Sequence, residues 1–427
     1  MTISNFQTEF KKIASNQNSL FSEKTVALKE QAFSQFLKIG LPTKKWEGWQ
    51  NTDLSKIEKK EFRIPEENDN NKPSPDIPSC KIEGTHSIII LNGHYQEKLS
   101  SLPKGVKLLS NLEYLGKNNW KYKNPTNSPF DLLNTSLSSC EISIIIEPRI
   151  DVKSPIQIVF ICSGTDNLLV SPRLKIDVSS SSSVTFIERH IGSENYFFQN
   201  TSIFISIDNN SFLDHIRIQS ESKKTININN LHVEQHNDSK YNFFQFINQS
   251  GLTRSNIYNY LKGTGSECLL NGLTLLEQQE HCDTHIITNH ISPECTSLQN
   301  FKFVLNQKSS GVFNGRTIVH KGSQKTDSKQ SNKNLLISND AAMNSNPQLE
   351  IYADDVKCAH GSTTGALDDD ALFYLRSRGL NTQIAKALLI RGFSNELIDT
   401  IKNHSVKSLI LLKFNDWVEK NTDLKHG

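Results

Sequence analysis

The pattern of apolar positions changes twice along the chain. Near the N-terminus, apolar residues recur at helical intervals until Gly40 and Pro42 interrupt them; they are Val26, Leu28, Ala32, Phe33, Phe36 and Leu37. The next stretch, EENDNNKPSPDIPS from Glu66 to Ser79, is polar and rich in Pro and Asn, so it can bury little apolar surface. The sequence therefore predicts an N-terminal helical domain and linker over residues 1–85.

From about His86 to Ala366 the pattern becomes one of short β-branched and aromatic runs, such as SIIIL and SIFISI, separated by Ser, Asn, Asp and Gly. Four serines each end a polar turn, at intervals of 28, 28 and 27 residues, before the period blurs after Leu273: Ser183, Ser211, Ser239 and Ser266. Such a period is typical of a solenoid, in which each coil buries its apolar face on its neighbours. Because the LxxLxLxxN signature of leucine-rich repeats is missing, a parallel β-helix core over residues 86–366 is the better interpretation.

After Leu367 the helical pattern returns. Asp368 to Asp370 offer an N-cap and first-turn charges to ALFYLRSR, and Gly379 offers a C-terminal stop. A second helix is expected to end at Gly392, a third to start at Ser394, and SVKSLILLKFNDWVEK to form the last. Their apolar positions can form one compact face: Ile384, Leu388, Leu389, Leu397, Ile398, Ile401, Leu409 and Trp417. This predicts a C-terminal helical domain over residues 367–427.

Composition narrows the class of protein. Lys and Arg number 47 against 45 Asp and Glu, so no overall field favours nucleic acid or an anionic membrane. The N-terminus has no apolar run behind a basic start, and no apolar run approaches the length of a membrane span, so we expect a cytoplasmic protein. The seven Cys are scattered without a CxxC pair, which argues against a disulfide framework and against a local zinc or iron-sulfur ligand set.

The densest candidate for chemistry is LEIYADDVKCAHGSTTG, Leu349 to Gly365. In an extended strand, residues i and i+2 share a face, so Cys358 and His360 could present a sulfur and a nitrogen to one metal. Two ligands do not close a site, so the remaining ligands would have to come from elsewhere in the chain or from a partner. A lone Cys is more often a small buried hydrophobe, and a lone His a core residue, so a structural role stays open.

A carbohydrate-active β-helical enzyme is an alternative, because Asp354-Asp355 and His360-Gly361 resemble the paired carboxylates and His-Gly step of such enzymes. Adjacent strand residues point to opposite faces, whereas the two catalytic carboxylates must flank one bond. This alternation argues against the enzyme hypothesis.

A second cluster has spacing that suggests a metal site: His281, Cys282, His285, His290 and Cys295. On a helix His281 and His285 would share a face, but the flanking THIITNHI favours a strand, so we expect stacked coil residues. No GxxxxGK[ST] loop, dinucleotide fingerprint or nucleophile elbow occurs, so ATP and NAD sites are not indicated. A triad assembled from distant residues remains open.

Four segments carry a family resemblance: LPTKKWEGWQNTDL (Leu41 to Leu54), GVFNGRTIVHKGSQKTDSKQSNKNLLIS (Gly311 to Ser338), PQLEIYADDVKCAHGSTTG (Pro347 to Gly365) and LFYLRSRGL (Leu372 to Leu380). They resemble the SufB/SufD family of iron-sulfur cluster assembly proteins, and within it the SufD-type subunits. The family's SufB-type subunits carry a cluster-building Cys in a segment like QCDSLL and a HEATT motif. This chain reads KQSNKNLLIS and HGSTTG there, without that thiolate, which favours the supporting subunit.

The resemblance implies a right-handed parallel β-helix with helical ends, joined through the β-helix to a SufB-like subunit and through the C-terminal helices to a SufC-like ATPase. It further implies a scaffold without ATP chemistry of its own, in which Cys358 and His360 help to form a nascent iron or iron-sulfur site shared with the partner. No cluster would be held stably by this chain alone. Whether the chain pairs with itself when the SufB-like partner is absent stays open.

The same resemblance implies that closure of the ATPase subunits twists the scaffold pair and exposes its interface residues. The candidate ATPase-docking residues lie in and after LFYLRSRG, although their apolar members equally suit an internal core: Phe373, Tyr374, Arg376, Arg378 and Gly379.

Overall fold

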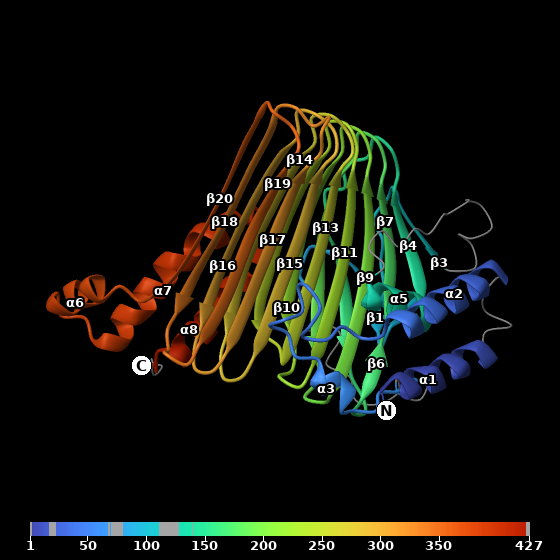
Figure 1. Ribbon diagram of the computed structural model, residues 1–427, viewed down its shortest axis with the longest axis horizontal. Coiled ribbons are helices and arrows are strands. Elements are labelled where there is room, and N and C mark those ends of the chain that lie inside the picture. Colours follow the sequence, from blue (N-terminus) through green and yellow to red (C-terminus); the bar gives the residue numbers. More distant parts are fainter. Residues whose placement is uncertain are drawn as a thin grey trace.

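In the computed structural model of the protein, parallel strands stack into a solenoid with helices at both ends (Figure 1). The structure describes residues 2–16, 23–66, 69, 80–110, 128–138 and 140–423. Most of the stretch Glu66 to Ser79, interpreted above as a linker, therefore lies outside the described residues. The helices are α1 (Thr2–Asn16), α2 (Glu23–Ile39), α3 (Ser55–Glu58), η4 (Glu97–Leu99), α5 (Pro129–Leu137), α6 (Asp369–Ser377), α7 (Thr382–Ile398) and α8 (His404–Asn421).

The strands form two sheets. Sheet 1 has the order β2 (His94–Tyr95), β1 (His86–Leu91), β5 (Ile156–Cys162), β8 (Ser183–Gly192), β10 (Phe212–Ser220), β12 (Lys240–Gln249), β14 (Glu267–Leu276), β16 (Thr296–Leu305), β18 (Thr326–Leu336), β20 (Val356–Ala366). Sheet 2 has the order β19 (Ala342–Ile351), β17 (Ser310–Val319), β15 (His281–His290), β13 (Leu252–Leu261), β11 (Ile226–Gln235), β9 (Phe197–Ile207), β7 (Arg173–Val178), β4 (Glu141–Ile146), β3 (Val106–Ser110), with β6 (Leu168–Val170) beside β9. From β7 onwards, successive strands alternate between the sheets, which confirms the predicted parallel β-helix, with about eight coils between residues 141 and 366.

The regularly spaced serines mark a turn that repeats in successive coils, but one of the four predicted positions is shifted by one residue. Ser183 pairs with Phe212, so Ser182, rather than Ser183, is the equivalent of Ser211. At Ser239 and Ser266 the hydroxyl donates to the carbonyl three residues earlier, that of His236 at 2.7 Å and that of Gly263 at 3.0 Å, whereas the Ser211 hydroxyl donates to the Ser179 carbonyl of the preceding coil at 2.7 Å.

The same position continues beyond the serines. Cys295 and Thr326 occupy it in the later coils, which explains why the serine period blurs although the coils continue. The preceding residue has the left-handed conformation that closes the turn, with φ of 53° at Asp238 and 71° at Gly265.

Three large apolar clusters hold the fold together. The first fills the solenoid and joins inward residues of both sheets, such as Phe186 and Ile205. The second joins α7 and α8 to the outer face of sheet 1, and the third joins α1, α2 and α5 to the outer face of sheet 2. The helices therefore share their cores with the sheets. Helix α5 also interrupts the region interpreted above as all-β; Pro129 starts it, and its Asn134 amide donates to carbonyls of Pro172 and Asn200 at 2.9 and 2.7 Å.

The C-terminal helices confirm some expectations and correct others. Asp368 caps α6, and Gly379 ends it with φ of 92°, as predicted. The expected break at Gly392 is wrong, because α7 runs through it and buries residues on both sides, including Ile390 and Ser394. The expectation that Ile384 and Leu388 join a compact apolar face is also wrong, since both are exposed. Within the described part of the chain, none of the helices combines the length and apolar character needed to span a membrane.

Candidate functional site

The last coil leaves an open edge at the C-terminal end of the solenoid. In the sheet order, β20 and β19 each have a single strand neighbour among the described residues, β18 and β17 respectively. Nearly all of β20 is solvent-exposed, in contrast to the buried inward positions of β18 beneath it. The open edge lies at the end of the molecule that carries α6 (Figure 1).

Cys358 and His360 lie on the same side of β20. Their register partners on β18 are Ser328 and Gln330, which are buried and point into the solenoid. Because side chains of paired residues in parallel strands point to the same face, Cys358 and His360 continue two inward columns at the point where no later coil covers them. Cys358 is half-buried and His360 is exposed. Partial burial raises the pKa of the Cys358 thiol.

The interior behind this pair is polar. The hydroxyls of Ser297 and Ser328 lie 2.9 Å apart, and the Gln330 amide donates to the Gln299 amide oxygen at 2.8 Å. Gln299 in turn donates to the Thr288 hydroxyl at 3.1 Å. Buried polar groups of this kind are stable when they bond to one another, so hydrogen-bonded columns of polar side chains lie behind the pair in the last coils.

A second network fixes the far half of β20. The Asn334 amide donates to the Thr363 carbonyl at 3.1 Å and to the Thr364 hydroxyl at 3.1 Å. Ser362 donates to Ser345 of β19 at 2.7 Å. These bonds tie the last three strands together, two residues and more beyond His360.

The described residues contain no group of three or more His, Cys, Asp or Glu side chains placed to hold a metal ion. The pair on β20 offers one thiol sulfur and one imidazole nitrogen, which suit iron as well as zinc. A metal held there needs further ligands from another molecule to reach a closed coordination shell.

Asp354 and Asp355 lie in the turn before β20, with the Asp355 N–H donating to Gln324 at 2.9 Å. The argument above that they alternate along a strand is therefore wrong for this pair. The turn instead uses its backbone groups to stack on the turn of the preceding coil.

The His281 to Cys295 cluster lies on β15 and the following turn, which confirms the strand interpretation. Cys282 belongs to the interior core, whereas His281 and His285 face outward. His281 contacts the hydroxyls of Thr52 at 3.1 Å and Ser310 at 2.7 Å, and His285 pairs with Asp283 at 3.0 Å. These histidines have protein partners of their own.

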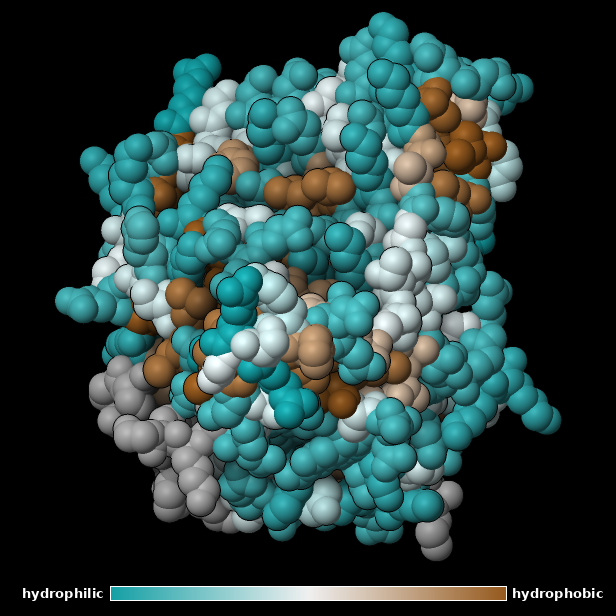
Figure 2. Space-filling view, turned by 90° about the vertical axis from the view of Figure 1, so that its left-hand side faces the viewer, coloured by the Kyte–Doolittle hydropathy of each residue, from teal (hydrophilic) through white to brown (hydrophobic). Residues whose placement is uncertain are grey.

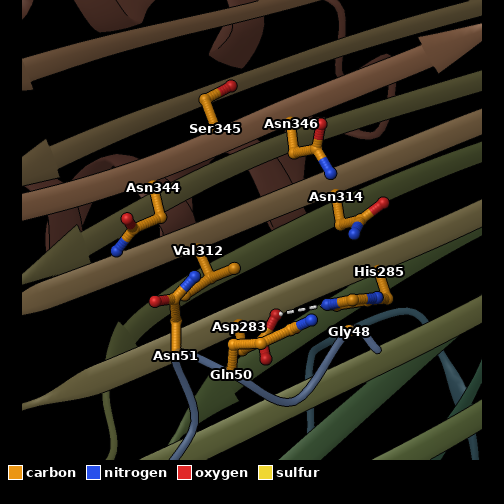
Figure 3. Close-up of a pocket in the computed structure, with 10 residues that line it drawn as sticks. All are labelled: Gly48, Gln50, Asn51, Asp283, His285, Val312, Asn314, Asn344, Ser345 and Asn346. Carbon is orange, nitrogen blue, oxygen red and sulfur yellow. Dashed lines mark ion pairs between the residues drawn. The ribbon is translucent and has the colours of Figure 1, made fainter. Parts of the chain in front are cut away.

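Beside them lies a pocket of about 280 Å³, between the loop at Gly48 and the outer face of sheet 2 (Figure 3). Its wall carries several carboxamides, among them Asn314 and Asn346, next to the Asp283–His285 pair. Burial favours protonated Asp283, but Arg254 and His285 outweigh this effect and hold the pKa of that carboxyl far below its usual value.

Arg254 also explains the N-terminal motif LPTKKWEGWQNTDL. Its guanidinium donates to the Gly48 carbonyl at 2.6 Å and lies 3.9 Å from the centre of the Trp49 ring. The motif is thus a loop docked on the sheet through a buried cation. Sequence reasoning missed Arg254 and Asp283, because a single Arg or Asp in a strand carries no spacing signal.

A buried charged cluster lies deeper in the solenoid. Glu188 is fully buried; one carboxylate oxygen contacts His190 at 2.6 Å and Arg217 at 2.9 Å, and the other contacts His215 at 2.8 Å. Burial favours its neutral form, yet Arg217 and the two histidines hold the pKa of Glu188 well below its usual value. All four side chains are buried, so the cluster is sealed from solvent and belongs to the solenoid interior.

The proposed ATPase-docking residues lie on a projecting surface. Helix α6 buries none of its residues, and the side chains of Phe373 and Tyr374 are 72% and 56% exposed. Arg376, Arg378 and Gly379 are exposed as well, with the Arg378 guanidinium 5.1 Å from the centre of the Tyr374 ring. Figure 2 shows this end of the molecule, where hydrophobic patches lie among hydrophilic surface. The alternative of an internal core for Phe373 and Tyr374 is wrong.

Comparison with known proteins adds independent evidence. Residues 3–158 match the model of the SufBD protein N-terminal region, and residues 160–393 match that of the SUF system FeS cluster assembly, SufBD core domain. An iron-sulfur cluster assembly SufBD family protein from Synechocystis sp. is 30% identical over 394 residues, covering 85% of this chain and 84% of the relative. The iron-sulfur cluster assembly protein SufD from Escherichia coli is 28% identical over 391 residues, covering 90% and 91%. Together with the parallel solenoid and its helical ends, these matches place the chain in the SufBD family of iron-sulfur cluster assembly proteins.

Proposed function

We propose that this chain is a SufD-like scaffold subunit, which pairs with a SufB-like subunit and contributes part of a nascent iron or iron-sulfur site. The observation that carries the proposal is the position of Cys358 and His360 on one side of an edge strand at the open end of the solenoid. Edge strands present unpaired backbone groups that a second chain can pair with. A partner docked there would bring its own ligands beside this sulfur and nitrogen.

The chemistry of the pair is suited to a temporary site. A protonated thiol must lose its proton to bind iron, and the partly buried Cys358 has a raised pKa, so binding is weaker than at an exposed thiolate. With two ligands from this chain, the cluster is a cargo assembled between subunits. No ATP or redox chemistry is assigned to the chain itself.

Exposed α6 supports a role in coupling to a SufC-like ATPase. Its aromatic residues are available for contact, and α7 behind it packs on sheet 1. Movement of an attached ATPase would therefore pull on the solenoid through α7. The absence of a Cys from KQSNKNLLIS favours the SufD-like role over a SufB-like scaffold, since that thiolate would be the sulfur acceptor.

The test is co-expression of the chain with SufB-like and SufC-like proteins, followed by purification of the complex and measurement of bound iron and sulfide. We expect Cys358→Ser and His360→Ala to form the complex but to lose most of the cluster. The matched control is Ser362→Ala, which changes the next inward position of β20 without removing a metal ligand.

Normal iron and sulfide in both ligand variants would reject the metal-site role. Failure of the wild-type chain to form any complex with these partners would reject the scaffold role. Size measurement of the chain expressed alone shows whether it pairs with itself through the same edge.

A further inference from the structure

A column of glutamine side chains ends directly behind His360. Gln299 and Gln330 are register partners on β16 and β18, and Gln330 and His360 are register partners on β18 and β20. Both glutamines are buried, at 0% and 3% exposure, whereas His360 is exposed at the end of the column. The three residues therefore occupy the same inward position in three successive coils.

The hydrogen bonds of this column leave one amide oxygen unused. Gln330 Nε2 donates to Gln299 Oε1 at 2.8 Å, and Gln299 Nε2 donates to the hydroxyls of Thr288 and Thr317 at 3.1 and 3.4 Å. The Gln330 amide thus turns its donor towards the preceding coil. Gln330 Oε1 is left as a buried acceptor without a hydrogen-bond partner among the described residues.

The position of the Gln330 amide is set by its surroundings. A Cβ atom at Gly315, on the facing strand β17, would lie 2.0 Å from Gln330 Nε2, so only glycine leaves room for the amide there. The bond to Gln299 and the space at Gly315 together hold the amide plane. Because oxygen and nitrogen diverge from one amide carbon, Oε1 faces away from the Gln299 oxygen that Nε2 contacts.

A buried acceptor without a partner destabilises the folded protein unless a donor reaches it. The next side chain of the column is His360, whose ring hydrogen-bonds to no other described residue in the structure. In a neutral imidazole, one ring nitrogen carries an N–H and the other carries a lone pair. A hydrogen bond donated by the N–H therefore fixes which of the two nitrogens carries the lone pair.

We propose that Gln330 is a positioning residue for His360: rotation of the exposed imidazole towards the column lets the unbonded Gln330 Oε1 accept the ring N–H, and this bond commits the other ring nitrogen, as a lone-pair donor, to the open edge. The consequence for iron binding rests on the proposed function, because the ring nitrogen that keeps its lone pair is the one offered to iron. The orientation itself is a property of this chain alone.

The test is the tautomer of His360 in the full chain without metal, measured by long-range ¹H–¹⁵N NMR on deuterated protein with ¹⁵N-labelled histidine. The His360→Gln variant assigns the signals, and pH 8 keeps an ordinary imidazole neutral. We expect one tautomer in the wild type and a rapidly exchanging mixture in Gln330→Met, which keeps the length of the side chain and removes the amide oxygen.

Two further variants separate positioning from general loosening. Gln330→Glu keeps an acceptor oxygen for the imidazole N–H and is expected to keep the single tautomer of the wild type. Asn334→Leu removes the bonds to Thr363 and Thr364 and loosens β20 without touching the His360 acceptor, so it is expected to keep the single tautomer. A mixture in the wild type, Gln330→Glu or Asn334→Leu, or one tautomer in Gln330→Met, would overturn the proposal. Because no iron is present, these results are independent of the cluster assay.

Discussion

The Lys302 ammonium of β16 lies 2.8 Å from the backbone carbonyl oxygen of Phe393 in α7. The same ammonium contacts the Glu396 carboxylate at 2.6 Å. Lys302 is 4% exposed and Glu396 is 67% exposed. A buried cation on the solenoid thus holds the helix that connects α6 to the rest of the molecule.

Lys302→Met should loosen this connection. The variant keeps the apolar stem and loses the charged donor, so we expect the free energy of unfolding to fall by about 1.5–3 kcal/mol, and amide exchange in α7 to rise. Glu396→Gln is the matched control and should cost under about 1 kcal/mol, because its side chain is exposed. Urea denaturation and hydrogen exchange measure both effects; equal losses in the two variants would contradict the role of the buried cation.

The Glu188 cluster predicts a dependence on charge pairing. Glu188→Gln leaves Arg217 buried without its counter-charge, so we expect a loss of about 3–5 kcal/mol at neutral pH. Because the pKa of Glu188 is depressed from 4.5, its contribution is present above about pH 4.5 and is lost as the pH falls further. The Glu188→Gln/Arg217→Met double variant removes both charges and should be more stable than the single one. A double variant as unstable as the single one would argue against charge pairing as the cause.

Glu280 should change the stability with pH in the direction opposite to Glu188. Burial raises the pKa of its carboxyl from 4.5 to about 7, so ionisation is more costly in the folded than in the unfolded state. Stability should therefore decline as the pH rises from 4.5 through 7, by at most about 3 kcal/mol. Glu280→Gln retains an acceptor for the Glu277 N–H and should remove this decline. Urea midpoints between pH 4.5 and 8 test it; parallel curves for the two proteins would exclude Glu280 as the source.

Exposed α6 gives a prediction about binding alone. Phe373→Ser/Tyr374→Ser should leave the melting temperature unchanged, because neither side chain is buried, and should weaken binding of a SufC-like ATPase by at least about tenfold. Leu99→Ser, at an exposed apolar residue of η4 near the other end of the solenoid, is the control for lost surface hydrophobicity. Calorimetry with the purified ATPase measures the affinity, and unchanged affinity in the double variant would place the docking surface elsewhere.

Local chemistry explains why much of the fold was predictable. Strand and turn residues alternate visibly, the Asp368 cap and the Gly379 stop act within one turn of their helix, and the turn hydroxyls recur because they bond to turn carbonyls in successive coils. Gly392 shows the limit of this reasoning. Its helix-breaking tendency is worth about 1 kcal/mol, and burial of the apolar side chains of Ile390 and Leu397 on sheet 1 outweighs it.

Part of the candidate site was likewise predictable from the sequence, and part depends on the tertiary structure. The two-residue spacing in a strand was enough to predict from the sequence alone that Cys358 and His360 share a face, and the lack of a third nearby ligand followed from the same segment. Only the tertiary structure could place that face at an uncovered coil, put Gln330 behind His360, and expose α6. The physical reason is range: strand alternation and capping act between neighbours in the chain, whereas register, burial and edges depend on coils some thirty residues apart.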